Sequence, residues 1–419
     1  MGRMIMGCEK ERETMRVLTG AIVVLAVFLA GCSGGGSSRS TLTIWESYND
    51  EEHAVFQKIV EKYQAQHPGV TIEVQRVPFQ GMEQKVLTAL AAGMPPDLAR
   101  VDYAFVATLA AKHAAVPILP EDLGSLAAEL LQAPLESNRI RDTLYGLPDQ
   151  TTCILLFYNK DLFQRYGVTA PPKTWDEFVA VGRRLTHPDQ GIYAFGMRNS
   201  LWWTFPFFFS FGAEFLSPDR SRCLLDSPEG IRAFTFKVNL YRKYRIEAGA
   251  WKPGAVSPDV GFVNGKYAMI LSGPWAIKQL QQMNLNFGIA PVPAGPAGSR
   301  TTIGGTNMVI LNPKKKAEAL KFLKFLLSPE IQAFWANELG QVPVNRKAFA
   351  RVDTLKHPFL PVIMRAMDTA VPRPPLANYG AIELAANAEM DLALQGKKSP
   401  EQALHDAVRR INELLKETP

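Results

Sequence analysis

TLTIW at residues 41–45 is a short apolar segment, and two more follow it, VTIEV at 70–74 and LARV at 98–101. Asp102 comes directly after the third. This composition predicts three strands. Between the first two, Asn49 is suited to cap a helix with an acidic first turn and an apolar face. A second amphipathic segment, MEQKVLTAL at 82–90, precedes the third strand. Strands that alternate with helices in this way predict a mainly parallel sheet flanked by helices.

The same alternation continues in the second half of the chain. A strand is predicted at 151–157, and TWDE at 174–177 is a capping box that opens a helix. The triplet Ser-Pro-Glu begins at residues 227, 328 and 399, and each copy places a capping serine before a proline at the first helical position. Late strands are predicted at 287–290 and 308–311. Because 419 residues exceed one ordinary domain, we expect two α/β lobes.

Composition excludes several classes of protein. The chain is 47% hydrophobic and 21% charged, which is enough apolar material to build a large core. A net charge of +6, from 46 basic and 40 acidic residues, does not call for a nucleic-acid partner. The six histidines show no metal-ligand spacing, and no zinc-protease, serine-hydrolase or phosphate-loop motif occurs. We therefore expect no metal, no cofactor and no catalytic centre.

The first segment indicates the compartment. Arg16 precedes the apolar run VLTGAIVVLAVFLA at 17–30, which is shorter than a membrane span and typical of a secretory signal. The run ends in LAGC at 29–32, which resembles the lipobox of bacterial lipoproteins. That resemblance implies cleavage after residue 31, acylation of Cys32 and a tether over 32–40; an ordinary signal peptide with a chance cysteine is the alternative. Met15 is a second possible start, since residues 1–14 add nothing that a signal needs.

Two further points concern the mature chain. Cys153 and Cys223 are the cysteines left in the folded body, and either a disulfide or two buried thiols fits the sequence. Aromatic residues also gather near predicted strand ends and turns, and they are Trp45, Trp202, Trp203, Trp275 and Tyr379. Such rings can cover the C–H face of a sugar while carboxylates and amides bind its hydroxyls. Core packing is the competing explanation, and of the aromatic run at 202–209 we expect one or two rings at most to face a cleft.

Six strings in order resemble family 1 extracellular solute-binding proteins of ABC importers, the group that includes maltose- and trehalose-binding proteins. They are LTIWE at 42–46, PDL at 96–98 with VD at 101–102, YGLP at 145–148 with YNKDLF at 158–163, PPKTWDEF at 171–178, FVNGKYAM at 262–269 with SGPW at 272–275, and VPVNR at 342–346. The resemblance runs from Thr41 to the C-terminal helix.

The resemblance implies a lipid-anchored, monomeric receptor of the cell envelope, at the periplasmic or extracytoplasmic face; whether it sits on an inner membrane or on the cell exterior stays open. It would capture a disaccharide or oligosaccharide between its lobes by hinge closure and deliver it to the permease subunits of the importer. The first lobe would comprise residues 41–148 and 303–352, and the second 149–302 and 353–419. The ligand residues carried over from the family are Glu46, Asp102, Gln150, Trp203, Trp275, Gly305, Arg373 and Tyr379.

Two other functions compete with sugar capture. A glycerophosphodiester or another polyol phosphate would suit Arg373 and the net positive charge. A secreted glycosidase would use Glu46 and Asp102 as its carboxylate pair, because both follow predicted strands. The sugar, its linkage and the permease are not determined by the sequence.

Overall fold

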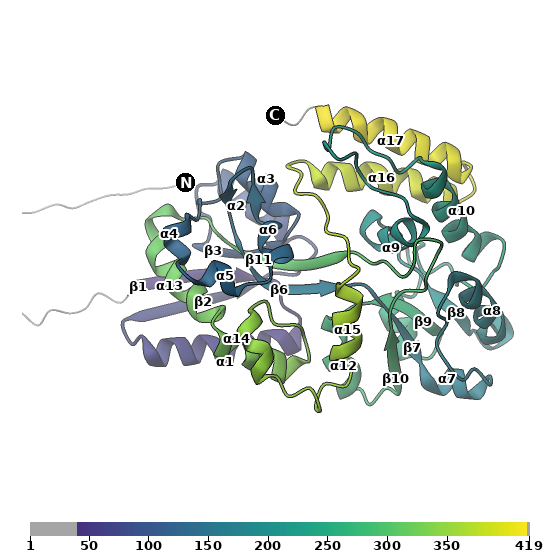
Figure 1. Cartoon of the computed structure of the whole chain (residues 1–419), viewed down its shortest axis with the longest axis horizontal. Helices are drawn as coiled ribbons and strands as arrows, with labels where there is room; N and C mark the ends of the chain where they lie inside the picture. Colours follow the sequence, from purple (N-terminus) through teal and green to yellow (C-terminus); the bar gives the residue numbers. More distant parts are fainter. Residues whose placement is uncertain (1–39, 417–419) are drawn as a thin grey trace, which may run out of the picture. The chain divides into compact units, whose positions relative to one another are not determined.

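Strand β1 (Ser40–Glu46) contains the run TLTIW and buries Leu42 and Ile44. The computed structural model of the chain describes residues 40–416 (Figure 1). The predicted signal peptide, Cys32 and the tether up to residue 39 lie outside them. β1 belongs to a five-stranded sheet of order β2-β1-β3-β11-β6. Its other strands are β2 (Val70–Arg76), β3 (Leu98–Asp102), β6 (Leu147–Cys153) and β11 (Ile303–Ile310).

The first sheet is mixed rather than mainly parallel. β1 pairs in parallel with β2 and with β3, as the alternation of strands and helices predicts. β11 runs antiparallel to both β3 and β6. The difference arises because a strand from late in the chain inserts between two strands from its first half.

A second, four-stranded sheet has the order β10-β7-β9-β8. Its strands are β7 (Leu155–Asn159), β8 (Tyr193–Gly196), β9 (Tyr267–Ser272) and β10 (Phe287–Ala290). β8 pairs in parallel with β9, while β7 is antiparallel to β9 and to β10, so this sheet is mixed as well. A separate small ladder joins β4 (Arg139–Ile140) to β5 (Thr143–Leu144). Two sheets flanked by helices confirm the predicted two-lobed α/β fold.

The chain passes from the first sheet to the second at Ile154, between β6 and β7. The single strand predicted at 151–157 is therefore two strands in different sheets. β6 also continues through the expected lobe boundary at residues 148–149. The remaining lobe limits stay a prediction.

The helices follow in sequence order. Up to β7 they are α1 (Asp50–Gln66), α2 (Met82–Ala91), α3 (Phe105–Ala111), α4 (Pro120–Leu123), α5 (Leu126–Glu129) and α6 (Gln132–Glu136). From β7 to β11 they are α7 (Lys160–Arg165), α8 (Trp175–Leu185), α9 (Leu201–Phe211), α10 (Pro228–Arg242), α11 (Pro258–Val263) and α12 (Ile277–Gln282). After β11 come α13 (Lys316–Leu326), α14 (Pro329–Leu339), α15 (Leu360–Met367), α16 (Tyr379–Leu394) and α17 (Pro400–Lys416). No helix among residues 40–416 has the length and apolar character that crossing a membrane requires.

Helix starts follow the capping signals of the sequence. The Asn49 side chain accepts the Glu52 N–H, and the Glu52 carboxylate accepts the Asn49 N–H, so α1 begins with a complete capping box. Thr174 accepts the Glu177 N–H at the start of α8. The serines of the three Ser-Pro-Glu triplets cap α10, α14 and α17. α16 and α17, the adjacent helices drawn in yellow, then pack on each other near the C-terminus (Figure 1).

Candidate ligand-binding site

A cavity of about 540 Å³ is lined by strands of the first sheet and by loops and helices that follow strands of both sheets. Seven of the eight predicted ligand residues lie on its wall, and they are Asp102, Gln150, Trp203, Trp275, Gly305, Arg373 and Tyr379. They come from β3, β6, β11, α9, the turn after β9, the segment before α16 and the first residue of α16. The tertiary structure thus brings together residues that are up to 277 positions apart in the chain. Their role in binding remains a prediction.

Three tryptophans form an aromatic wall. Trp202 and Trp203 lie in the first turn of α9, and Trp275 follows β9. The ring centroids of Trp202 and Trp203 are 4.6 Å apart, and that of Trp275 lies 6.0 Å from Trp202 and 6.2 Å from Trp203. The later rings of α9 are buried, and they are Phe205, Phe207, Phe208 and Phe209. The run at 202–209 therefore divides between cavity and core, with its two tryptophans on the cavity.

Asp102 and Arg373 form an ion pair at the cavity wall. Arg373 Nη2 donates to both carboxylate oxygens of Asp102, at 2.8 and 2.9 Å. The guanidinium also lies 4.3 Å from the ring centroid of Tyr103 and 5.2 Å from that of Tyr379. Burial opposes the charged form of Arg373, but Asp102 and the tyrosine oxygens outweigh it and raise its pKa well above the usual value. The guanidinium stays charged, and its charge is already balanced by Asp102.

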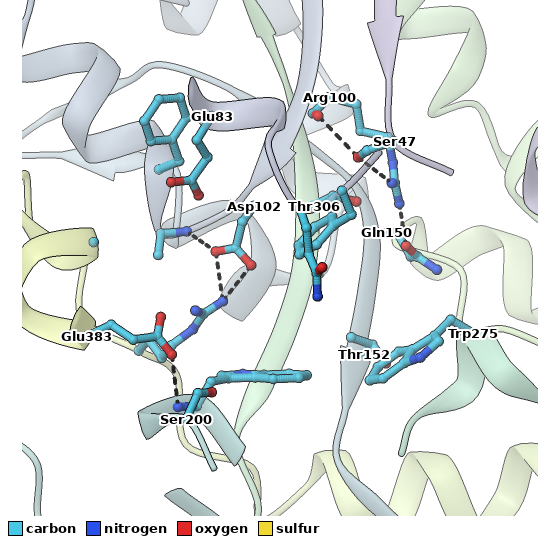
Figure 2. A pocket seen from close by; sticks show the side chains of 18 of the residues that line it. Ser47, Glu83, Arg100, Asp102, Gln150, Thr152, Ser200, Trp275, Thr306 and Glu383 are labelled. Carbon is cyan, nitrogen blue, oxygen red and sulfur yellow. Dashed lines mark hydrogen bonds and ion pairs between the residues drawn. The ribbon is translucent and has the colours of Figure 1, made fainter. Parts of the chain in front are cut away.

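Three further carboxylates, Glu52, Glu83 and Glu383, line the cavity without an ion-pair partner among residues 40–416, and Glu52 is held by amide donors described below. Glu83 lies in the first turn of α2, and Glu383 lies in α16. Burial raises the pKa of Glu83 to about 7, with a further rise from the negative charges of Asp102 and Glu383 and an opposing effect from Arg373. Burial also raises the pKa of Glu383, whose carboxylate accepts the Trp202 N–H at 3.3 Å. Figure 2 shows Glu83, Asp102 and Glu383 on the same side of the cavity.

Arg100 forms hydrogen bonds with several side chains in the part of the wall across from Glu83, Asp102 and Glu383 (Figure 2). Its Nε donates to Asp149 Oδ2 at 2.7 Å, and its Nη1 donates to Ser47 Oγ at 3.2 Å. The side-chain oxygen of Gln150, Oε1, accepts a hydrogen bond from Arg100 Nη2. The Gln150 amide nitrogen donates to Glu52 Oε1 at 2.8 Å and also to Gln341 Oε1. Because both amide hydrogens of Gln150 are used, a ligand would meet only its remaining carbonyl lone pair.

Gly305 provides backbone rather than a side chain to the cavity. Its φ is +142°, and a Cβ there would lie 2.3 Å from the carbonyl oxygen of Gln150 on the paired strand β6. Only glycine fits this conformation at so close an approach. The wall at this point of β11 is therefore main chain without a side chain.

Glu46, the eighth predicted ligand residue, lies away from the cavity. It is fully buried and is not among the described residues that line the cavity. Its Oε2 accepts the Tyr48 N–H at 2.6 Å, and its Oε1 lies 2.7 Å from His53 Nδ1. Its carboxylate thus holds the turn after β1 instead of facing a ligand. This placement contradicts the glycosidase hypothesis, which needed Glu46 and Asp102 across one cleft.

Trp45 is likewise absent from the described wall. Its ring lies under Lys85 Nζ, 4.6 Å from the ring centroid, and packs on a hydrophobic cluster of the first sheet. The competing interpretation of core packing holds for this tryptophan. Cys153 and Cys223, which the sequence left open, are both buried free thiols. Burial raises the pKa of each to about 12, so both stay protonated at neutral pH.

Sequence reasoning missed several wall residues, and they are Phe79, Glu83, Arg100, Arg198 and Glu383. Arg100 sits within a strand that reads as apolar, and Glu83 and Glu383 sit on helices where a carboxylate is normally a solvated surface group. No local signal separates them from ordinary helix carboxylates. A cue did exist for Phe79, an aromatic residue that stands between Pro78 and Gly81 and so in a predicted turn.

The family model that matches this chain is that of the bacterial extracellular solute-binding proteins, over residues 49–333. The chain belongs to this family, and the predicted resemblance is confirmed.

Curated relatives extend over nearly the whole chain. A binding protein of Brucella abortus is 28% identical, over 93% of this chain and 95% of its own length. The sn-glycerol-3-phosphate-binding periplasmic protein UgpB of Escherichia coli is 26% identical, over 91% and 94%. The maltodextrin-binding protein MdxE of Bacillus subtilis is 24% identical, over 94% and 95%.

Solved structures show the same fold. An ABC transporter solute-binding protein from Thermotoga lettingae, bound with α-D-tagatose, is 27% identical with a TM-score of 0.83, and the match covers 90% of this chain and all of that one. The maltose-bound MalE3 of T. maritima is 27% identical with a TM-score of 0.79, over 90% and 99%.

Proposed function

We propose that this protein is the sugar-binding component of an ABC importer. The observation that carries the proposal is that Trp202, Trp203 and Trp275 line one cavity together with charged and hydroxyl side chains. A sugar has an apolar C–H face and a rim of hydroxyls, and this wall offers a matching partner for each. The maltodextrin-binding and sugar-bound relatives support the same class of ligand.

The polar side of the cavity suits hydroxyl groups. Glu83 and Glu383 are acceptors, and hydrogen bonds from hydroxyls to ionised carboxylates are stronger than neutral ones. Thr152 Oγ1 and Thr306 Oγ1 lie buried in the wall with no hydrogen-bond partner in the described chain. A hydroxyl-rich ligand would satisfy groups that are otherwise left unpaired.

Delivery of the ligand to a permease follows from the parts of the fold that contribute the cavity wall. Residues near both sheets line one cavity, so a ligand that contacts both would stabilise one arrangement of the lobes. We propose that this loaded form docks on the permease. We further propose that acylated Cys32 and the tether hold the body at the outer face of the membrane.

A polyol phosphate is the second candidate, because UgpB of E. coli is a relative and three arginines line the cavity. The charges argue against it. Arg373 pairs with Asp102, Arg198 with Asp259, and Arg100 with Asp149. A phosphate would have to compete with these carboxylates while it approaches Glu83 and Glu383, which carry the same sign of charge.

The test is a thermal-shift screen of the chain from Ser33 to Pro419 against sugars and sn-glycerol 3-phosphate. A ligand that binds only the native state raises the melting temperature by mass action. We expect a rise with at least one sugar that is lost in Trp275→Ala. It should persist in Trp251→Ala, a matched loss of a tryptophan outside the cavity wall. A response to glycerol 3-phosphate alone would overturn the sugar assignment.

A further inference from the structure

We propose that the captured sugar carries a basic nitrogen, which lies as a cation between the carboxylates of Glu83 and Glu383. This inference rests on the proposed function and specifies the class of its ligand. An amino sugar in its protonated form is the simplest molecule of this kind. The inference depends on the charges of the cavity wall and on polar groups left without partners.

The first step is the charge balance of the wall. Five carboxylates and three guanidinium groups line the cavity. Each guanidinium already has a carboxylate partner, and the pairs are Arg373–Asp102, Arg198–Asp259 and Arg100–Asp149. Glu52 is held by neutral donors, because its Oε1 accepts from both Gln150 and Gln341. Glu383 accepts hydrogen bonds from the Trp202 N–H and from Ser200 but has no ion-pair partner, and Glu83 has neither kind of partner among residues 40–416.

The second step is where these two carboxylates lie. They come from different helices, α2 and α16, and Figure 2 shows them on one side of the cavity beside Asp102. The charged groups that face Glu83 are Asp102, Arg373 and Glu383, and the two carboxylates among them repel it. A neutral sugar can donate hydroxyl hydrogens to this region but cannot remove the repulsion. A bound ammonium group can, because it adds one positive charge.

The third step is an independent sign of a missing ligand. Thr152 and Thr306 are 5% and 4% exposed and line the cavity, yet their hydroxyl oxygens have no partner within the described residues. A hydroxyl oxygen can accept a hydrogen bond from an N–H or O–H group of a ligand. The aromatic wall adds a further attraction, since a cation is stabilised over a tryptophan face. The unpaired hydroxyl oxygens thus fit ligand donors, while the unpaired donors Trp202 Nε1 and Arg373 Nε in the same wall fit hydroxyl or ring oxygens of a sugar.

Binding of an ammonium group beside Glu83 should also release a proton from its carboxyl group. Burial raises the pKa of Glu83 to about 7, so near neutral pH this carboxyl is partly protonated in the unliganded protein. Binding of an ammonium group favours the carboxylate, and the proton leaves to the buffer. A neutral sugar would leave the protonation of Glu83 nearly unchanged. Proton release therefore distinguishes a cation at Glu83 from ordinary hydroxyl contacts.

The experiment is calorimetric titration of the Ser33–Pro419 chain with matched sugars at pH 7. The sets are glucose, glucosamine and N-acetylglucosamine, and cellobiose, chitobiose and N,N′-diacetylchitobiose. Only the C2 group changes among hydroxyl, ammonium and neutral amide, on the single ring of the first set and on both rings of the second. We expect the amine of at least one set to bind about tenfold more tightly than its neutral partners, or better. Its binding enthalpy should also depend on the ionisation enthalpy of the buffer.

Two variants locate the effect. Glu83→Gln should remove the buffer dependence and most of the amine preference, and Glu383→Gln should reduce the preference. Glu121→Gln, on the exposed surface of α4, should change neither. Neutral sugars that bind as tightly as the amines would overturn the inference and leave the sugar-receptor function standing. Binding of glycerol 3-phosphate in place of all these sugars would overturn both, and absence of any binding would overturn the amino-sugar inference as well.

Discussion

Gly273 leaves the space that the indole of Trp275 occupies. A Cβ on Gly273 would lie 2.0 Å from Trp275 Cζ3, well inside van der Waals contact. The strings Ser272-Gly273 and Pro274-Trp275 therefore act as one structural unit, in which the glycine lets the ring fold back over its own chain. The orientation of one member of the aromatic wall depends on the absence of a methyl group two residues earlier.

Gly273→Ala should weaken sugar binding with little loss of stability. The ring of Trp275 is only partly buried, so it can rotate away from the new methyl group instead of forcing the backbone to move. We expect the dissociation constant to rise about tenfold or more, measured by calorimetry with any sugar that the screen identifies. A double-mutant cycle is the control, because in the Trp275→Ala background the glycine substitution should cost almost nothing. Additive effects of the two substitutions would contradict the proposed coupling.

Asp102→Asn should destabilise the protein far more than Asp259→Asn. Both carboxylates pair with an arginine of the cavity wall, but Asp102 is mostly buried, while 58% of the Asp259 side chain is exposed. Loss of Asp102 leaves the buried charge of Arg373 without its partner, which costs about 3–5 kcal/mol. Loss of an exposed partner costs at most about 1 kcal/mol. Urea unfolding of both variants measures the difference, and equal losses would refute this reading of the buried pair.

Lys237 should make the free energy of unfolding rise with pH above neutrality. Its ammonium group is buried and donates to Asn199 Oδ1 at 2.7 Å, and burial lowers its pKa to about 7 despite the opposing charges of Asp391 and Glu247. Between about pH 7 and the ordinary lysine pKa of about 10.4, the unfolded chain binds a proton that the native state does not. Stability from this group therefore increases as the pH rises, by up to about 1.4 kcal/mol per pH unit, and below pH 7 the dependence vanishes.

The measurement is urea unfolding of wild type and Lys237→Gln from pH 6 to 9.5. The glutamine keeps a hydrogen-bond donor but has no titrating group, so the difference between the two curves should change mainly above pH 7. Lys112→Gln, an exposed lysine, is the control and should give no such difference. Parallel curves for wild type and Lys237→Gln would show that Lys237 keeps its proton in the native state.

Cys32→Ser should release the full-length protein from the membrane. The predicted acylation takes place on the sulfur and on the new amine of this residue, and the serine offers no thiol. We expect wild type in the membrane fraction and the variant in the aqueous fraction after cell fractionation. Cys153→Ser removes a buried thiol instead and should leave the distribution unchanged. A variant that stays with the membrane would contradict the lipid anchor.

Local signals in the sequence predicted the elements of this fold. Asn49, Thr174 and the Ser-Pro-Glu serines mark helix starts because a capping side chain acts within three residues of its own position. The strings around Asp102 and Trp275 carried the resemblance to the family, and both residues lie on the cavity wall. In these cases a cap or a motif consists of a few neighbouring residues, so it can be recognised in the sequence without knowledge of the fold.

Long-range packing determined the rest. Glu46 and Asp102 both follow strands of one sheet, yet Glu46 turns toward His53 and the Tyr48 N–H while Asp102 reaches Arg373, 271 positions away. Likewise, Glu83 and Glu383 look like ordinary helix carboxylates until α2 and α16 bring them to one cavity. The sequence by itself indicated the family, the first strands and helices in their order, and the aromatic candidates. The tertiary structure alone decided the antiparallel place of β11 and which carboxylates remain unpaired, because a side chain's partner depends on contacts between segments far apart in the chain.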